Sequence, residues 1–379
     1  MHYLDNAATT RPFPSIIEFV QQCLTTQFGN PSSIHPAGVK ANQIINESRK
    51  TLAGIFDVPL AGVIFCSSGT ESDNLALKGL VNNQSDANTS LVTSKLEHAA
   101  IFNTAEWLEQ CGIQVKYVDI DSSSGRIDLQ HLATIIGPDT RLVSIQHVNS
   151  ETGIIQDLPE ISRIVKSRNP SAIVHSDGVQ AFSKIPVNLK QMGVDLYSIS
   201  AHKFHGIKGA AALICARDTP LTALIHGGGQ EFGLRSGTEN VAAIAAMGQA
   251  AKITFENLQV NLKEISAFSN WFKERLGEEL EAVRIFDSPH LVPHIISISV
   301  LGVPGELLLN HLANNGIFVG LGSACSSSSN KFSETLKALK FGHQQIKETI
   351  RISLAAHELP SDRKLFLRSF VDSIKELLD

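Results

Sequence analysis

Short runs of β-branched and other apolar residues alternate with longer helix-like segments between about residue 50 and residue 250. This alternation is typical of an α/β fold with a mostly parallel sheet, because each parallel strand needs a crossover helix before the next one. The expected strands are 63–66, 91–93, 114–118, 142–147, 173–175, 196–200 and 211–215. Helices are expected between several of them, over 72–80, 101–110 and 158–167.

The pattern changes beyond residue 250. A long helix is expected over about 240–280, followed by a strand at 295–300 and helices at 306–314 and 361–378. This mixture indicates a smaller α+β domain, and 379 residues are enough for two cores. We therefore expect a large ligand-binding domain over 15–255 and a small domain formed by 1–14 and 256–379.

The composition of the chain limits the kinds of binding partner that we expect. The chain is 43% hydrophobic and 18% charged with a formal net charge of −5, which indicates neither a nucleic-acid nor a membrane partner. The longest small-apolar stretch, 241–251, is too short to cross a bilayer, and the first residues lack the pattern of a signal peptide. A cytoplasmic protein is the default expectation.

The five cysteines are scattered and form no CxxC pair, which argues against a disulfide framework and against a structural metal site. Four of them have apolar neighbours and are expected to be buried: Cys23, Cys66, Cys111 and Cys215. Cys325 differs, because it lies in the small, polar run 320–330, which is typical of a loop.

A carboxylate and a lysine each follow an apolar run. Asp177 ends the run that begins at 172, and Lys203 follows the run 195–200. Strand ends of this kind reach the crevice in which α/β proteins bind ligands. Pyridoxal phosphate (PLP) needs a lysine for its aldehyde and an anion beside its ring nitrogen, so the pair suits that cofactor. Taken alone, a loop cap and a surface lysine would be the more common explanation.

The segment 66–73 follows one expected strand and opens a helix, where backbone N–H groups can bind phosphate. Gly69 would allow a close approach, although Thr70-x-x-Asp73 also resembles a capping box. The glycine-rich segment 227–238 is either a second anion site or a set of turns.

Three more side chains are candidates on position alone. His98 could stack on a planar cofactor or transfer protons, or it could simply cap a helix or lie in the core. The same alternatives hold for His202. Gln180 lies one helical turn after Asp177 and could face the same ligand.

Taken in order, these motifs resemble the NifS/IscS type of cysteine desulfurase, within the class V aminotransferases (fold type I PLP enzymes). The resemblance covers nearly the whole chain and is carried by YLDNAATT (3–10), GNPSS (29–33), SGTES (68–72), EH (97–98), VNSETG (148–153), DGVQ (177–180), SAHK (200–203), RSGT (235–238), GSAC (322–325) and RISL (351–354).

The resemblance implies a role for each cofactor-binding candidate. Lys203 would hold PLP as a Schiff base, Asp177 would pair with the ring nitrogen, and Gln180 would hydrogen-bond the ring hydroxyl. His98 would stack on the ring and could shuttle protons, and Ser150 would lie near the cofactor. In the homodimer of the family, the phosphate would be held by Gly69, Thr70, Ser200 and His202 and by Thr238 of the partner subunit.

It also implies the reaction. Arg351 would clamp the carboxylate of L-cysteine, with Asn149 and Ser150 nearby. Cys325 would attack the substrate sulfur, which leaves L-alanine and a persulfide on Cys325. A sulfur-acceptor protein would then collect the sulfur for iron–sulfur cluster assembly or tRNA thiolation.

Two positions depart from the family. Ser150 stands where a second asparagine is usual and lacks the amide donor, and Leu321 stands where a small polar residue is common. The alternatives are selenocysteine lyase or another class V PLP enzyme, a non-catalytic partner that keeps the PLP fold, and a nucleotide-binding α/β protein. Lys203 and Cys325 argue against the non-catalytic partner, and a nucleotide-binding protein does not explain Asp177, Lys203 and Arg351 together.

Overall fold

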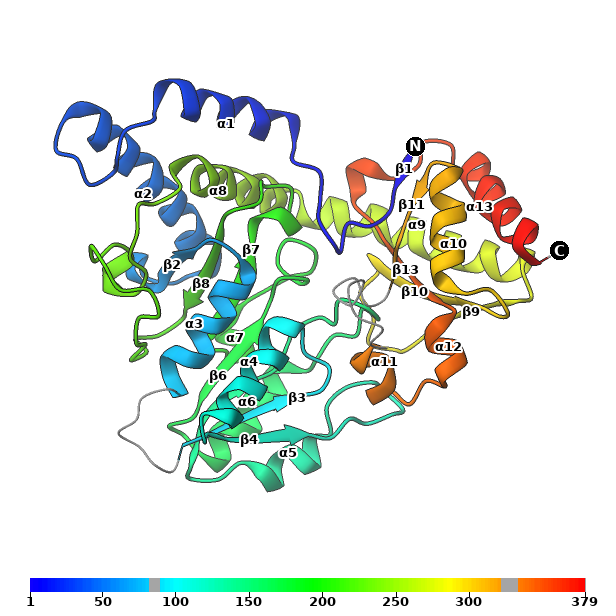
Figure 1. Ribbon diagram of the computed structural model, residues 1–379, viewed down its shortest axis with the longest axis horizontal. Coiled ribbons are helices and arrows are strands. Elements are labelled where there is room, and N and C mark those ends of the chain that lie inside the picture. The colour runs from blue at the N-terminus through cyan, green and yellow to red at the C-terminus, as the bar shows by residue number, and fades with distance from the viewer. Residues whose placement is uncertain (82–88, 322–332, 379) are drawn as a thin grey trace.

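A seven-stranded sheet forms the centre of the larger part of the molecule (Figure 1), with the strand order β2-β8-β7-β6-β5-β3-β4. The computed structural model describes residues 1–81, 89–321 and 333–378. All strand pairs of this sheet are parallel except the two that involve β8. The predicted fold class is therefore confirmed. The strands are β2 (Val63–Cys66), β3 (Ser90–Ser94), β4 (Gln114–Val118), β5 (Thr140–Ser144), β6 (Ile173–Asp177), β7 (Leu196–Ser200) and β8 (Ala211–Cys215).

Helices cover both faces of this sheet, because its side chains alternate between two apolar cores. Val63 and Phe65 of β2 join one core, and Ile64 and Cys66 join the other. The first core packs against α2 (Pro36–Phe56), α6 (Leu158–Arg168) and α8 (Val241–Glu256). The second packs against α3 (Gly69–Val81) and α4 (Ala99–Gln110). The remaining helices of this part are α1 (Pro14–Thr26), α5 (Leu129–Ile135) and α7 (Leu189–Met192).

A second, antiparallel sheet has its own core. Its order is β12-β13-β10-β9, and Phe268, Phe272, Phe366 and Phe370 are packed in that core together with Leu4. The strands are β9 (Val283–Ile285), β10 (Ile295–Val300), β12 (Gly320–Leu321) and β13 (Thr349–Ser353). The helices are α9 (Leu258–Glu279), α10 (Gly305–Asn314), α11 (Glu334–Ala338), α12 (His343–Lys347) and α13 (Arg363–Leu378).

The N-terminal segment joins the two parts. Strand β1 (His2–Tyr3) pairs in parallel with β11 (Ile317–Phe318) beside the second sheet. A few residues later, the backbone N–H of Thr10 donates to the carbonyl of His202, which follows β7 of the central sheet. Figure 1 shows this segment running between the two parts of the molecule.

The structure corrects three details of the prediction. The long helix over 240–280 is two helices, because Asn257 adopts φ −101° and ψ 6° between α8 and α9. The apolar spacing continues across this break and so gave no sign of it. Strand β5 ends at Ser144, and 145–147 lie beyond it. Cys111 is exposed, not buried, because it caps the C-terminus of α4.

Within residues 1–81, 89–321 and 333–378, no helix combines the length and the apolar character that a membrane span requires.

A buried ion pair fixes the glycine-rich segment 227–238 against α2. The two guanidinium nitrogens of Arg49 lie 2.9 and 2.7 Å from the two carboxylate oxygens of Glu231, and the backbone N–H of Phe65 donates to the same carboxylate. Only 7% of the Arg49 side chain and 2% of the Glu231 side chain are exposed. Because water is excluded, each charge depends on the other.

We predict that Arg49→Met lowers the free energy of unfolding by roughly 3–5 kcal/mol, since it strands the buried Glu231 carboxylate. The matched control is Arg163→Met, which removes an exposed ion pair with Glu160 and should cost about 0–1 kcal/mol. Denaturant unfolding of the three proteins measures both effects. Equal losses in the two variants would contradict the importance of the buried pair.

Candidate cofactor site

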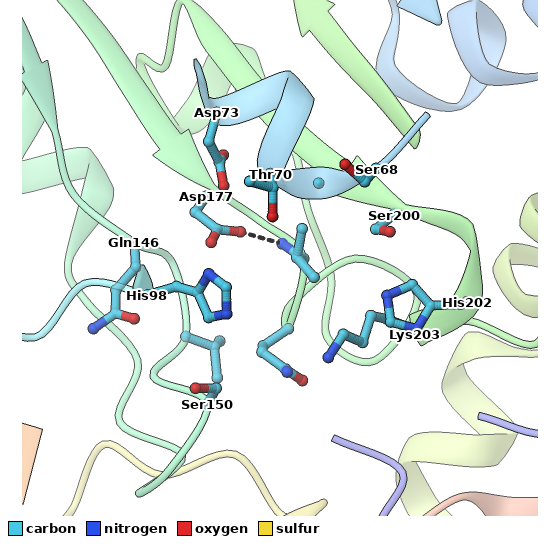
Figure 2. Close-up of a pocket in the computed structure, with 14 residues that line it drawn as sticks. Ser68, Thr70, Asp73, His98, Gln146, Ser150, Asp177, Ser200, His202 and Lys203 are labelled. Carbon is cyan, nitrogen blue, oxygen red and sulfur yellow. Dashed lines mark hydrogen bonds between the residues drawn. The ribbon is translucent and has the colours of Figure 1, made fainter. Parts of the chain in front are cut away.

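A cavity of about 190 Å³ lies where the carboxyl ends of β3, β5, β6 and β7 meet the N-terminus of α3 (Figure 2). Parallel strands bring their carboxyl ends to one edge of the sheet, so segments far apart in sequence converge there. The predicted residues that line this cavity are Gly69, Thr70, His98, Ser150, Asp177, Gln180, Ser200, His202 and Lys203. The structure therefore brings most of the predicted cofactor site together, while the role of each residue stays a prediction.

Asp177 is the last residue of β6 and is 8% exposed. One carboxylate oxygen accepts a hydrogen bond of 2.9 Å from the backbone N–H of Val179, drawn as the dashed line in Figure 2. Burial raises the pKa of Asp177, whereas positive charge on His98 and Lys203 and the Val179 bond lower it. A positive group entering the cavity would help this buried carboxylate to stay ionised.

Lys203 follows β7 at the end of a short 3-10 turn, Ala201–Lys203. Its Nζ donates to the backbone carbonyls of Ala7 and Ala8, at 2.5 and 2.9 Å. The N-terminal segment thus holds the amine at the wall of the cavity.

Gln180 and Lys184 continue the same hydrogen-bond system. Gln180 Nε2 donates to the carbonyl of Ala7 at 2.8 Å, and Lys184 Nζ donates to Gln180 Oε1 at 3.2 Å. Burial, together with the positive charges of Lys203 and Arg351, lowers the pKa of Lys184 to about 7. Hydrogen bonds at the amide nitrogen and at the amide oxygen therefore fix the orientation of the Gln180 side chain.

The N-terminus of α3 forms another wall. A Cβ atom at Gly69 would lie 3.1 Å from Val179 Cγ2 and 3.5 Å from Ser200 Cβ, so this position is closely surrounded. The cap is Ser68, whose Oγ accepts from the backbone N–H of Glu71, and not Thr70 as the capping-box pattern suggested. A helix start of this kind attracts anions such as phosphate.

His98 has a capping role as well as a place at the cavity. Its Nδ1 accepts from the backbone N–H of Ala100 at 3.1 Å, at the start of α4. In the neutral ring the proton is then on Nε2. His202 lines the cavity too, and burial with the nearby lysines Lys203, Lys208 and Lys184 lowers its pKa to about 3. The His202 ring is therefore neutral near pH 7.

Arg351 does not line the cavity. It lies on β13 and is 3% exposed, and its Nη2 pairs with Asp5 Oδ1 at 2.8 Å. Its Nη1 donates to the backbone carbonyl of Ser150 at 2.9 Å. The guanidinium is thus linked through Ser150 to the cavity wall, and its pairing with Asp5 fixes the orientation of its plane.

Two further predicted residues are also placed elsewhere, and one is not described. The side-chain oxygen of Asn149 accepts from the backbone of Glu151 and Thr152, and its amide donates to the carbonyl of Leu96, so it shapes its own loop. Thr238 is exposed and does not line the cavity of its own chain. Cys325 lies outside the described residues, as do its neighbours 322–332.

Sequence reasoning missed Asp73 and Gln146, which also line the cavity. Asp73 lies one helical turn after Gly69 and Thr70, on the same face of α3. That spacing was a usable signal, but a capping box explained the same residue. Gln146 lies beyond the end of β5, and its Nε2 donates to the carbonyl of Leu96.

Glu97 accepts a hydrogen bond from Gln146, which lines the cavity, and its ionisation should make the stability of the protein depend on pH. It accepts from Ser94 Oγ and from the backbone N–H of Gln146, yet full burial raises its pKa to about 8. Between the ordinary value of 4.5 and this folded value, the unfolded chain releases the proton that the folded protein keeps. The contribution of Glu97 to stability is therefore lost as the pH rises through this window.

We predict that Glu97→Gln becomes more stable relative to wild type between about pH 5 and about pH 8, by up to roughly 1.4 kcal/mol per pH unit. Denaturant unfolding at a series of pH values measures this difference. The control is Glu160→Gln, whose pKa is lowered by Arg163 and which should show no such trend. A constant difference between Glu97→Gln and wild type would contradict the assignment.

Known proteins of one family are similar to this chain over nearly its whole length. The family model described as "Aminotransferase class-V" matches residues 2–363. The cysteine desulfurase IscS of Dictyoglomus turgidum is 37% identical over 362 residues, which cover 95% of this chain and 91% of the relative. A solved structure described as a NifS-like protein matches with a TM-score of 0.91 and 33% identity, over 100% of this chain and 99% of that one.

A second solved structure, described as SspA in complex with cysteine, has a TM-score of 0.83 and 29% identity over 94% of this chain and 99% of that chain. Sequence, fold and site geometry thus point to one family. The chain belongs to the aminotransferase class-V family, whose members are PLP-dependent enzymes, and its similar relatives within that family are of the IscS/NifS type.

Proposed function

We propose that this protein is a PLP-dependent cysteine desulfurase, which removes sulfur from L-cysteine and leaves L-alanine. The observation that carries the proposal is the convergence of Asp177, Lys203 and the N-terminus of α3 around one cavity. The names of its relatives support the same activity, since they are described as cysteine desulfurases and one similar structure contains cysteine.

The residues around the cavity fit PLP by their chemistry. Lys203 would hold the aldehyde through a Schiff base, and the buried Asp177 carboxylate would face the ring nitrogen. Gln180 would donate to the ring hydroxyl, and His98 would stack on the ring. The phosphate would be held by Gly69, Thr70, Ser200 and His202. When bound, PLP supplies the electron sink that allows bonds at the substrate α-carbon to break.

We assign the transfer of the substrate α-carbon proton to Lys203. With its amine free, Lys203 Nζ would be the base for the α-carbon proton of the substrate. The carbonyls of Ala7 and Ala8, which accept from Lys203 Nζ, keep the released amine at the cavity wall.

Arg351 would bind the substrate carboxylate. Its Nη2 pairs with Asp5 and its Nη1 donates to Ser150, whereas its buried Nε has no hydrogen-bond partner in the described part of the chain. A buried donor without a partner carries a cost that a bound carboxylate would remove. Asn149 would act indirectly, by holding the loop that carries Ser150.

Cys325 would complete the reaction. Its thiolate would form a bond to the substrate sulfur while the carbon–sulfur bond of the substrate breaks, and protonation of the carbon would give alanine. The persulfide on Cys325 would pass its sulfur to an acceptor protein, for iron–sulfur cluster assembly or tRNA thiolation. We further propose a cytoplasmic homodimer with Thr238 reaching the partner's phosphate site, and domains over 15–255 and over 1–14 with 256–379.

We predict that Cys325→Ala still binds PLP but loses sulfide and alanine production from L-cysteine. The matched control is Cys111→Ala, which removes an exposed thiol outside the site and should keep the wild-type rate. Mass spectrometry of wild type after brief exposure to L-cysteine should find one added sulfur on the Cys325 peptide. Wild-type turnover by Cys325→Ala, or added sulfur on Cys111 instead, would contradict the proposed nucleophile.

We also predict that borohydride fixes PLP onto the peptide that contains Lys203. The reduced, digested protein is mapped by mass spectrometry, and Lys203→Ala should carry no label. Lys184 is the internal control, because its amine is buried nearby and also has a lowered pKa. Label on Lys184 in the wild type would show that the wrong lysine was assigned.

A further inference from the structure

A second carboxyl group, Asp73, lies in the wall of the cavity beside Asp177. It comes from α3, whereas Asp177 ends β6, and it is only 1% exposed. Figure 2 shows the Asp73 side chain pointing toward Asp177 from the helix above it. Two buried carboxyl groups thus share one end of the cavity.

Within the described residues, neither a lysine nor an arginine forms an ion pair with Asp73. Asp73 Oδ1 has no hydrogen-bond partner in the described part of the chain, and His175 Nε2 lies 3.7 Å from it. That imidazole is neutral, because burial lowers the pKa of His175 to about 3. Its two nitrogens lie 2.9 Å from Ser144 Oγ and 3.1 Å from Ser198 Oγ, so hydroxyl groups occupy both.

The titratable groups that face Asp73 favour its neutral form. Burial is the largest cause, the carboxylate of Asp177 from β6 adds to it, and Glu97 from the loop after β3 acts in the same direction only when it is ionised. Together they raise the pKa of Asp73 well above its usual range, and the hydroxyl of Ser198 opposes this only in part. Two adjacent carboxyl groups in a buried site cannot both ionise easily.

Of the two carboxyl groups, Asp177 is the one whose surroundings favour the ionised form. It accepts from the backbone N–H of Val179, and the positive charge of Lys203 favours its ionised form. Asp73 has neither a backbone donor of this kind nor a cation among the groups that act on it. The single negative charge of the pair therefore belongs to Asp177.

We propose that Asp73 is a positioning residue that keeps its proton at neutral pH and presents a neutral carboxyl to Asp177, so that Asp177 remains the single anion available to the ring nitrogen of the cofactor. The inference rests on the proposed function, because it takes Asp177 to face that ring nitrogen. An ionised Asp73 would compete with Asp177 for the ring and would disfavour the charge on Asp177.

The test compares Asp73→Asn with Asp177→Asn in the full chain. Asparagine matches the shape and neutrality of a protonated aspartic acid, so Asp73→Asn should bind PLP within about threefold of wild type. The visible absorption band of the bound PLP should also change with pH at the same midpoint as in wild type. Asp177→Asn loses the charged partner and should bind PLP at least about tenfold more weakly.

A direct measurement on the wild type removes the dependence on how the variants fold. The infrared spectrum of the PLP-loaded protein, labelled with carbon-13 aspartate, should contain the band of a protonated aspartic acid at neutral pH. Asp73→Asn should remove this band. The matched control, Asp195→Asn, should leave it, because Asp195 is a buried carboxylate paired with Lys166 and Arg217 at 2.7 Å each.

Absence of the band in wild type, or its persistence in Asp73→Asn, would overturn the inference. So would a tenfold loss of PLP affinity or a shifted pH midpoint in Asp73→Asn. If wild type itself binds no PLP, or if Asp177→Asn binds it as tightly as wild type, then the proposed cofactor site fails and the inference fails with it. The wild-type and Asp177→Asn results therefore separate the two kinds of failure.

Discussion

The site depends on a negative charge kept inside the protein at Asp177. Burial raises the pKa of this carboxyl, whereas the hydrogen bond from the backbone of Val179 and the nearby positive charge of Lys203 lower it. The fold supplies these groups from different strand ends of one parallel sheet. A cationic ring nitrogen would complete the arrangement, which explains why a cofactor of this chemistry suits the cavity.

The N-terminal segment connects the two ends of the proposed reaction. Asp5 pairs with Arg351 on the second sheet, and Ala7 accepts from both Gln180 and Lys203 at the central sheet. The same short stretch therefore contacts the residue proposed to bind the substrate carboxylate and the lysine proposed to hold the cofactor. Movement of one part of the molecule against the other would alter both contacts together.

Much of the fold and the cavity could be predicted, because β2, β4, β7 and β8 have the predicted bounds and ligand-binding residues follow strand ends. The break at Asn257 could not be, since apolar periodicity continues through it. Arg351 was expected at the ligand, but the spacing of a sequence does not reveal its pairing with Asp5. Asp73 was overlooked because a capping box accounted for it locally, whereas its burial beside Asp177 is a tertiary feature.

The central claim is that these residues carry out desulfuration of cysteine rather than another class V reaction. The most direct measurement supplies L-cysteine and a reductant to the PLP-loaded protein and follows alanine and sulfide together. The account predicts that both products appear at equal rates and in equal amounts. Pyruvate or a transaminated product in place of alanine, or no sulfide, would contradict it, and turnover of L-selenocysteine alone would identify the lyase instead.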